Sequence, residues 1–367
     1  MEGILKAADV RKSYGALDVL KGVSLRCKPG ERLVILGESG EGKTTLLEIL
    51  SGLEHPDSGR VLVGDREITR HSSRERDVGF VFQDKALWDG KTVEDHLKYP
   101  LEWRGHGESS HSERIKRVIS LVRLTEKRKS RVDNLSGGQR QRVGLARALV
   151  TDPTFVLMDE PFSDLDPPLR SSLRQEVVEL QEQLGFGLIF VTHDSQEALE
   201  LADRLMILHH GRVVQEGPPS EIVEAPASEH VARFLGYHNI VEVGGGGDGE
   251  DGREDLAALY NGTVESAGSN FPTAILPPGS LSLSNSPAEP GDATVRATVV
   301  DWHYRSGGGG TVKVEAFGFD EPLRVDVENP ILYSSGETVA LRVDRNEVIW
   351  IPPAEDRPEE EIHANQN

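Results

Sequence analysis

The chain has 367 residues and a formal net charge of −20, from 61 acidic and 41 basic residues. This length suits one large domain and a second, smaller one. The charge argues against a nucleic-acid binder, because affinity for a phosphate backbone needs clustered basic side chains. No apolar run approaches the ~18–20 residues that span a bilayer, and the start of the chain lacks a signal-peptide pattern. Cys27 is the only cysteine, so no internal disulfide is possible, and we expect a protein of the cytoplasmic side.

The first strong pattern along the chain is a phosphate-binding loop. Residues 34–36 are an apolar run typical of a buried strand, residues 37–44 match G-x-x-x-x-G-K-[ST], and residues 45–50 have helical spacing. Glycines let successive N–H groups face one anion, and a helix start adds the positive end of its dipole. We expect Lys43 to reach the β- and γ-phosphates of a nucleotide and Thr44 to bind Mg²⁺. The predicted phosphate-binding residues of this loop are Gly37, Ser39, Gly40, Gly42, Lys43, Thr44 and Thr45.

Residues 84–150 favour helix, and they contain the pentapeptide Leu-Ser-Gly-Gly-Gln at 135–139. The apolar spacing of residues 113–124 predicts one helix, and residues 144–150 continue another. The glycines of the pentapeptide leave backbone N–H groups free to meet phosphate. The pentapeptide lies too far along the chain to complete its own loop's site, so we expect a second subunit to be closed over the nucleotide. The residues predicted to make this contact are Ser136, Gly137, Gly138 and Gln139.

Acidic residues follow the next apolar strand, predicted at 155–158. We expect Asp159 to hold Mg²⁺ opposite Thr44, and Glu160 to orient or deprotonate the attacking water. The alternative is a pair of solvated acids at a strand end, which the apolar run before them and Pro161 after them make less favourable.

Two further residues are predicted at the same edge of the sheet. The strand expected at 189–192 runs into His193, which is placed to donate to the γ-phosphate and hold the water. Gln83 follows another expected strand end, and we predict that it touches both Mg²⁺ and water. The structural alternative for His193 is an ordinary hydrogen-bonding role.

The composition changes near residue 237. We predict a strand at 239–243, a mobile Gly/Asp-rich stretch at 244–252, and a flexible hairpin loop at 307–310. Further strands are predicted at 294–300, 311–316, 323–327, 338–343 and 348–351. Short strands with Gly/Pro turns indicate a small β-barrel or sandwich, so we predict an all-β OB-like domain over 237–353 and an acidic disordered tail over 354–367.

Together these motifs resemble the ATP-binding-cassette (ABC) ATPases over about residues 4–236. By this resemblance the Walker A loop is 37–44, the Q-loop glutamine Gln83, the signature 135–139, the Walker B strand 155–160, the D-loop 163–166 and the switch histidine His193. Tyr14 falls where the family stacks an aromatic ring on adenine, although a surface turn tyrosine remains the alternative. Asp164 departs from the small residue that many members carry there.

The resemblance implies an α/β P-loop NTPase fold with a RecA-like core, a helical subdomain at about 84–150 and an antiparallel β subdomain. It also implies ATP and Mg²⁺ as ligands, and a head-to-tail homodimer that closes on ATP and opens after hydrolysis. The C-terminal strands resemble the transport-associated OB (TOBE) domain of importer ATPases. In the family the helical subdomain contacts the membrane permease. Trp88, Val93, Leu97 and Tyr99 could line that groove or simply pack within the subdomain.

We therefore expect an ATPase that energises a solute importer on the cytoplasmic face of the membrane. Its expected partners are integral-membrane permease subunits, a solute-binding protein reached through the permease, and a second copy of itself, with no nucleic acid. An inorganic ion or a polyamine is favoured over a sugar as the solute. The alternatives are a soluble cassette ATPase of DNA repair or translation, and an exporter ATPase.

Overall fold

The computed structural model describes residues 3–105, 107–242, 273–284, 294–305, 308–316, 319, 321–344 and 347–351. The chain divides into two compact units, Met1–Pro219 and Ser220–Asn367. The boundary predicted near residue 237 falls inside the second unit, because helix α8 (Glu229–Phe234) shares an apolar cluster with Ile275 and Ile351. The predicted segments 244–252 and 354–367 lie outside the described residues, as does part of the loop 307–310.

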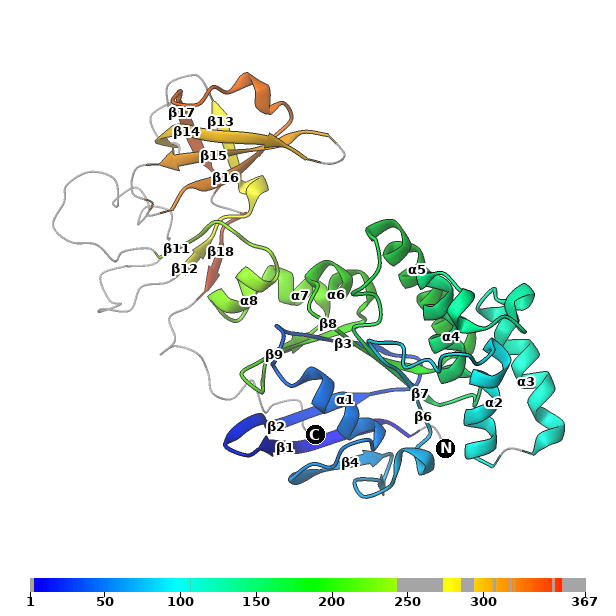
Figure 1. The fold of residues 1–367 in the computed structure, drawn as a ribbon. Helices are drawn as coiled ribbons and strands as arrows, with labels where there is room; N and C mark the ends of the chain where they lie inside the picture. Colours follow the sequence, from blue (N-terminus) through cyan, green and yellow to red (C-terminus); the bar gives the residue numbers. More distant parts are fainter. Residues whose placement is uncertain are drawn as a thin grey trace. The chain divides into compact units, whose positions relative to one another are not determined.

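The first unit is built on a mixed sheet and an antiparallel sheet (Figure 1). The mixed sheet has the order β10 (Arg212–Gly217), β9 (Arg204–His209), β3 (Arg32–Leu36), β8 (Gly187–Thr192), β7 (Phe155–Asp159) and β6 (Val78–Val81). The antiparallel sheet has the order β2 (Leu17–Cys27), β1 (Leu5–Tyr14), β4 (Ser58–Val63) and β5 (Arg66–Glu67). In the mixed sheet all neighbours pair in parallel except β10 with β9. The carboxyl ends of β3, β7 and β8 therefore meet at one edge.

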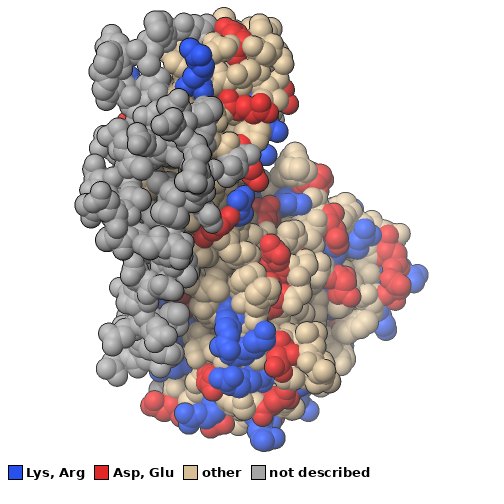
Figure 2. Space-filling model, turned by 90° about the vertical axis from the view of Figure 1, so that its left-hand side faces the viewer, with Lys and Arg blue, Asp and Glu red and all other residues tan. Residues whose placement is uncertain are grey.

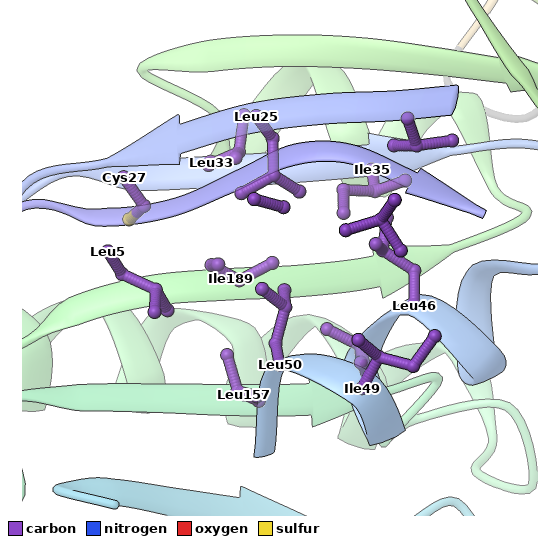
Figure 3. Close-up of a cluster of buried hydrophobic side chains, with 14 of the residues drawn as sticks. Leu5, Leu25, Cys27, Leu33, Ile35, Leu46, Ile49, Leu50, Leu157 and Ile189 are labelled. Carbon is purple, nitrogen blue, oxygen red and sulfur yellow. The ribbon is translucent and has the colours of Figure 1, made fainter. Parts of the chain in front are cut away.

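One face of the mixed sheet is covered by helix α1 (Lys43–Ser51). Its apolar residues recur at helical spacing, and Leu46, Ile49 and Leu50 are fully buried. Figure 3 shows these side chains near Ile189 of β8 and Leu157 of β7. The same cluster includes Leu5 and Leu20 of the antiparallel sheet. The helix that follows the phosphate loop is thus held by packing on both sides.

The opposite face of the mixed sheet is covered by α4 (Gly137–Leu149) and α5 (Pro167–Leu184). Successive residues of a strand point to opposite faces, so Met158 faces away from the side on which Leu157 meets α1. A small pocket on this second face is lined by Met158 together with residues of α4 and α5. Helices α1 and α4 therefore lie on opposite faces of the same sheet.

The remaining helices are short or peripheral: α2 (Val93–Trp103), α3 (Glu108–Leu121), α6 (Ser195–Leu201) and α7 (Pro219–Glu224). The helix predicted at 113–124 is found as α3, which begins earlier and ends at Leu121. The helix predicted after the signature begins within it, at Gly137. Within the described residues, none of the helices is both long enough and apolar enough to pass through a bilayer.

The second unit contains antiparallel sheets, as the alternating pattern predicts. One has the order β11 (Ile240–Glu242), β12 (Thr273–Ile275) and β18 (Ile349–Ile351). The other has the order β13 (Leu281–Ser284), β17 (Thr338–Val343), β14 (Thr294–Tyr304), β15 (Gly310–Ala316) and β16 (Leu323–Val327). Each of the predicted C-terminal strands overlaps one of these, whereas β12 and β13 were not predicted individually. Val299, Val312 and Leu341 are central to a shared apolar cluster.

Charged side chains of both signs are interspersed on the face drawn in Figure 2, with one group of basic side chains in its lower half. Acidic side chains therefore do not cover that face uniformly, although the sequence has a net negative charge.

Candidate functional site

The phosphate loop runs from the end of β3 to the start of α1, in the strand–loop–helix order predicted. Gly40 and Gly42 both have φ of 90°, in the left-handed region that only glycine adopts without strain. A Cβ on Gly37 would lie 2.7 Å from the carbonyl oxygen of Leu208 on β9. Two of the loop's glycines are therefore required by backbone conformation and the third by the close approach of a neighbouring strand.

Lys43 points back into this loop. Its side chain is only 4% exposed, and Nζ donates hydrogen bonds to the carbonyl oxygens of Gly37 and Glu38, each at 2.8 Å. The same Nζ lies 3.4 Å from Glu160 Oε1. The ammonium group is thus held where the loop and the end of β7 meet.

Thr44 and Asp159 bring two oxygen donors together beside that lysine. The Thr44 hydroxyl donates to Asp159 Oδ1 at 3.1 Å. Burial raises the pKa of Asp159, and the hydrogen bond from Thr44 opposes this only in part. A hydroxyl and a carboxylate are hard oxygen ligands of the kind that Mg²⁺ prefers, so these residues fit the predicted ion.

Glu160 and His193 form the next contact along the same edge. Nδ1 of His193 lies 2.8 Å from Glu160 Oε2. Glu160 has φ of 37°, a left-handed conformation that is uncommon for a residue with a side chain and is often retained at functional positions. Its N–H donates to the Val191 carbonyl at 3.1 Å, which fixes the turn after β7 against β8.

The structure therefore brings Lys43, Thr44, Asp159, Glu160 and His193 together, at the ends of β3, β7 and β8. Their roles in binding and catalysis remain predictions.

Gln83 and Tyr14 are both exposed, and neither side chain forms a hydrogen bond or an ion pair with this cluster. Gln83 follows the end of β6. Tyr14 is 47% exposed, with Lys12 Nζ 5.1 Å from the centre of its ring. An exposed ring on β1 is compatible with either interpretation given for Tyr14.

The signature residues form the start of α4. Ser136 is exposed and caps the helix: its Oγ accepts from the Gln139 N–H at 3.3 Å, and its own N–H donates to Gln139 Oε1 at 3.0 Å. Gly138 is packed on Leu169, whose Cδ1 would lie 3.1 Å from an added Cβ. Because α4 and α1 cover opposite faces of the sheet, this helix start is not part of the Lys43 cluster of its own chain.

Sequence inspection missed Arg170 on α5. Its guanidinium donates to the carbonyl oxygens of Ser163 and Leu165 at 3.4 and 3.3 Å, and to Asp194 at 3.4 Å. It thus links the segment after Glu160 to the residue after His193. The only sequence signal was its position one helical turn after Asp166, the N-cap of α5; nothing in the sequence indicated the partner Asp194.

The fold and these residues define a P-loop nucleotide-binding protein. A family model described as ABC transporter matches residues 20–163. The Fe(3+) ions import ATP-binding protein FbpC of Rhizobium etli is 44% identical over 239 residues, which cover 65% of this chain and 68% of the relative. The sulfate/thiosulfate import ATP-binding protein CysA of Synechococcus elongatus is 41% identical over 237 residues, covering 65% and 69%.

Solved structures agree with this assignment. CbiO1 of Clostridium perfringens, part of an ABC transporter complex, has a TM-score of 0.55 at 30% identity and covers 60% of this chain and 91% of its own. The ADP conformation of MJ1267, an ATP-binding cassette of an ABC transporter, has a TM-score of 0.56 at 25% identity and covers 64% and 98%. This chain belongs to the ATP-binding proteins of ABC transporters, and the predicted P-loop fold and ATPase class are confirmed.

Proposed function

We propose that this chain is the ATP-hydrolysing subunit of a solute importer, working as a homodimer that closes on ATP and opens after hydrolysis. The observation that carries the proposal is the pairing of Glu160 with both Lys43 and His193 at the carboxyl edge of the sheet. This arrangement places a carboxylate, a phosphate-binding ammonium and an imidazole around one position.

The chemistry of this position suits hydrolysis of a phosphoanhydride. The loop N–H groups and Lys43 would bind the β- and γ-phosphates and stabilise their charge in the transition state. Glu160 would take a proton from the attacking water, and His193 would orient that water through its contact with Glu160. Mg²⁺ held by Thr44 and Asp159, with Gln83 near it, would neutralise charge on the phosphate oxygens.

A second copy would complete each site. Ser136 is exposed at a helix N-terminus, and the N–H groups of Gly137 and Gly138 are in the first turn of α4, which suits them to bind an anion. Their position on the far face from α1 supports a site shared between two copies rather than one closed within a chain. Closure over the γ-phosphate would then assemble the hydrolytic site, and loss of that phosphate would release it.

Import of an inorganic ion is the transport role that the relatives support best, because the two named above import Fe(3+) and sulfate or thiosulfate. We infer that membrane permease subunits bind this chain at the cytoplasmic face and that a solute-binding protein acts through them. The exposed rings of Trp88 and Tyr99, 4.8 Å apart by their centroids, lie in the helical region proposed to meet the permease. The OB-like domain is proposed to hold the dimer together or to sense a ligand.

Reconstitution tests this function. The chain is placed in proteoliposomes with the permease that co-purifies with it from native membranes and with the cognate solute-binding protein. ATP-dependent uptake of an inorganic ion, absent with Glu160→Gln, is the expected result. Failure of any permease to co-purify from native membranes would contradict the importer proposal, and solute movement in the opposite direction would support the exporter alternative.

A further inference from the structure

A cluster of potential metal ligands lies beside the phosphate loop. Glu41 belongs to that loop, His209 is the last residue of β9, and His210 begins the turn to β10. Nδ1 of His209 lies 3.2 Å from Glu41 Oε1, and Nδ1 of His210 lies 3.9 Å from the same oxygen. One ligand atom from each of the three residues lies within 4.8 Å of the other two.

The two segments that carry these residues are anchored on the same strand. A Cβ on Gly42 would lie 2.9 Å from the Val19 carbonyl oxygen, and one on Gly211 would lie 2.4 Å from it. Lys21 N–H also donates to the Gly211 carbonyl at 2.9 Å. Both the phosphate loop and the β9–β10 turn therefore pack on β2, so the three side chains converge without a change of fold.

The exposure of the three side chains suits an ion that enters from solvent. Glu41 is 11% exposed and His209 is 23% exposed, whereas His210 is 77% exposed. The rings of the two histidines are 3.8 Å apart by their centroids. Two of the ligands are thus mostly buried, and the third is open to solvent.

Two imidazoles and one carboxylate are the ligand set of many zinc and iron centres. Ligands placed about 2.0–2.1 Å from a tetrahedral ion are about 3.4 Å from one another, close to the 3.2 and 3.9 Å seen here. We propose that Glu41, His209 and His210 form a binding site for one divalent transition-metal ion of the Zn²⁺ class. A solvent molecule would take the fourth position.

An ion at this site would tie the phosphate loop to the β9–β10 turn. It is distinct from the Thr44–Asp159 pair, which offers only oxygen donors and so favours Mg²⁺. Because the ion would bind the folded chain and not the unfolded one, it would also stabilise the fold.

The test uses the full chain without nucleotide, freed of metal by a chelator and kept in excess Mg²⁺ to fill oxygen-donor sites. Co²⁺ is titrated while its visible absorption is followed, and Zn²⁺ is then added to displace it. We expect saturation at one ion per chain, displacement by Zn²⁺, and a higher Tm with Zn²⁺. His210→Ala and Glu41→Gln should each bind Co²⁺ at least about tenfold more weakly.

His303→Ala is the matched control, since it removes an exposed histidine in the second unit and should bind like the wild type. Circular dichroism checks that each variant is folded; if Glu41→Gln is not, His210→Ala carries the test, because its side chain is mostly exposed. Equal binding by wild type, His210→Ala and His303→Ala would overturn the proposal, as would an absence of saturable binding to the wild type. Neither result would bear on the transport role, because the experiment measures metal binding to the chain without nucleotide.

Discussion

His193 Nδ1 lies 2.8 Å from Glu160 Oε2, while the other oxygen of the same carboxylate faces Lys43 Nζ at 3.4 Å. Glu160 is thus held between a residue of the phosphate loop and one from the end of β8. A carboxylate placed in this way can accept a proton beside the phosphate that Lys43 binds.

Glu160→Gln should therefore abolish turnover while nucleotide binding is kept. The amide has nearly the same shape but cannot accept the water's proton, so we expect kcat to fall by about 10²–10⁴-fold. Single-turnover hydrolysis and fluorescent-nucleotide titration measure the two effects, and size-exclusion chromatography should show a trapped dimer with ATP. Fast hydrolysis by this variant would refute the assignment of Glu160 as the base.

Mixed dimers test whether the signature acts across the subunit boundary. Lys43→Ala and Ser136→Arg should each inactivate a homodimer, by loss of phosphate binding and by blocking the signature contact. In a shared-site dimer, a Lys43→Ala copy paired with a Ser136→Arg copy keeps one intact site. Random mixing should then restore about a quarter of wild-type ATPase activity, because half of the dimers are mixed and each has one working site.

A doubly substituted chain provides the control for this experiment. This chain carries both Lys43→Ala and Ser136→Arg and is paired with a wild-type chain. If the sites are shared, each site of that mixed dimer contains one of the two substitutions, so neither site is intact. If each chain instead closed its own site, that pairing would stay half active and the two single variants would not rescue each other.

The sequence predicted the cluster well because its residues follow apolar strands. Parallel strands bring their carboxyl ends to one edge, so the positions of Asp159, Glu160 and His193 relative to Lys43 could be inferred from strand order alone. Their side-chain contacts could not, since those depend on backbone details such as the φ of 37° at Glu160.

Contacts between distant segments were the part that sequence patterns missed. Arg170 pairs with Asp194, and Glu41 meets His209 across 168 positions of the chain. The spacing of polar residues along the sequence does not indicate which of them will be in contact in the fold. Strands β12 and β13 were missed for another reason: they are only 3 and 4 residues long, too short for a clear alternation.

Asp159→Asn should stabilise the fold at neutral pH while it removes Mg²⁺-dependent hydrolysis. The pKa of Asp159 is raised by burial, so the folded state binds the proton more tightly than the unfolded state does. The wild type therefore loses stability as pH rises from the ordinary value of 3.8 through the raised one. Asparagine avoids that loss, and its amide oxygen can still accept from Thr44.

Thermal unfolding of both proteins from pH 4 to pH 8 measures this difference. The advantage of the variant should be largest at the alkaline end and shrink as the pH falls. A variant less stable than the wild type at pH 8 would show that the charged carboxylate is stabilised in the fold by more than its hydrogen bond to Thr44.

Arg76→Lys should destabilise the first unit, because Arg76 closes the C-terminal end of the helix that follows the phosphate loop. The side chain is 1% exposed, and its guanidinium donates to the carbonyl oxygens of Ile49 and Leu50 at 2.5 and 2.7 Å. It also donates to Thr69 and His71 carbonyls at 2.9 and 3.0 Å. Burial lowers the pKa of Arg76 to about 10, so the guanidinium remains charged at neutral pH. Its positive charge interacts favourably with the negative end of the α1 dipole.

Lysine keeps the charge, but its three N–H donors are all on one nitrogen, so it cannot reach all four carbonyls. We expect the free energy of unfolding to fall by about 2–4 kcal/mol, mostly from buried carbonyl groups left unpaired. Urea titration followed by circular dichroism measures this. Arg60→Lys, at an exposed position of β4, is the control and should change stability by less than about 0.5 kcal/mol. Because Lys43 and Thr44 begin α1, a loosened end of that helix should also weaken nucleotide binding. Equal stability of the two variants would show that the buried guanidinium contributes nothing beyond its charge.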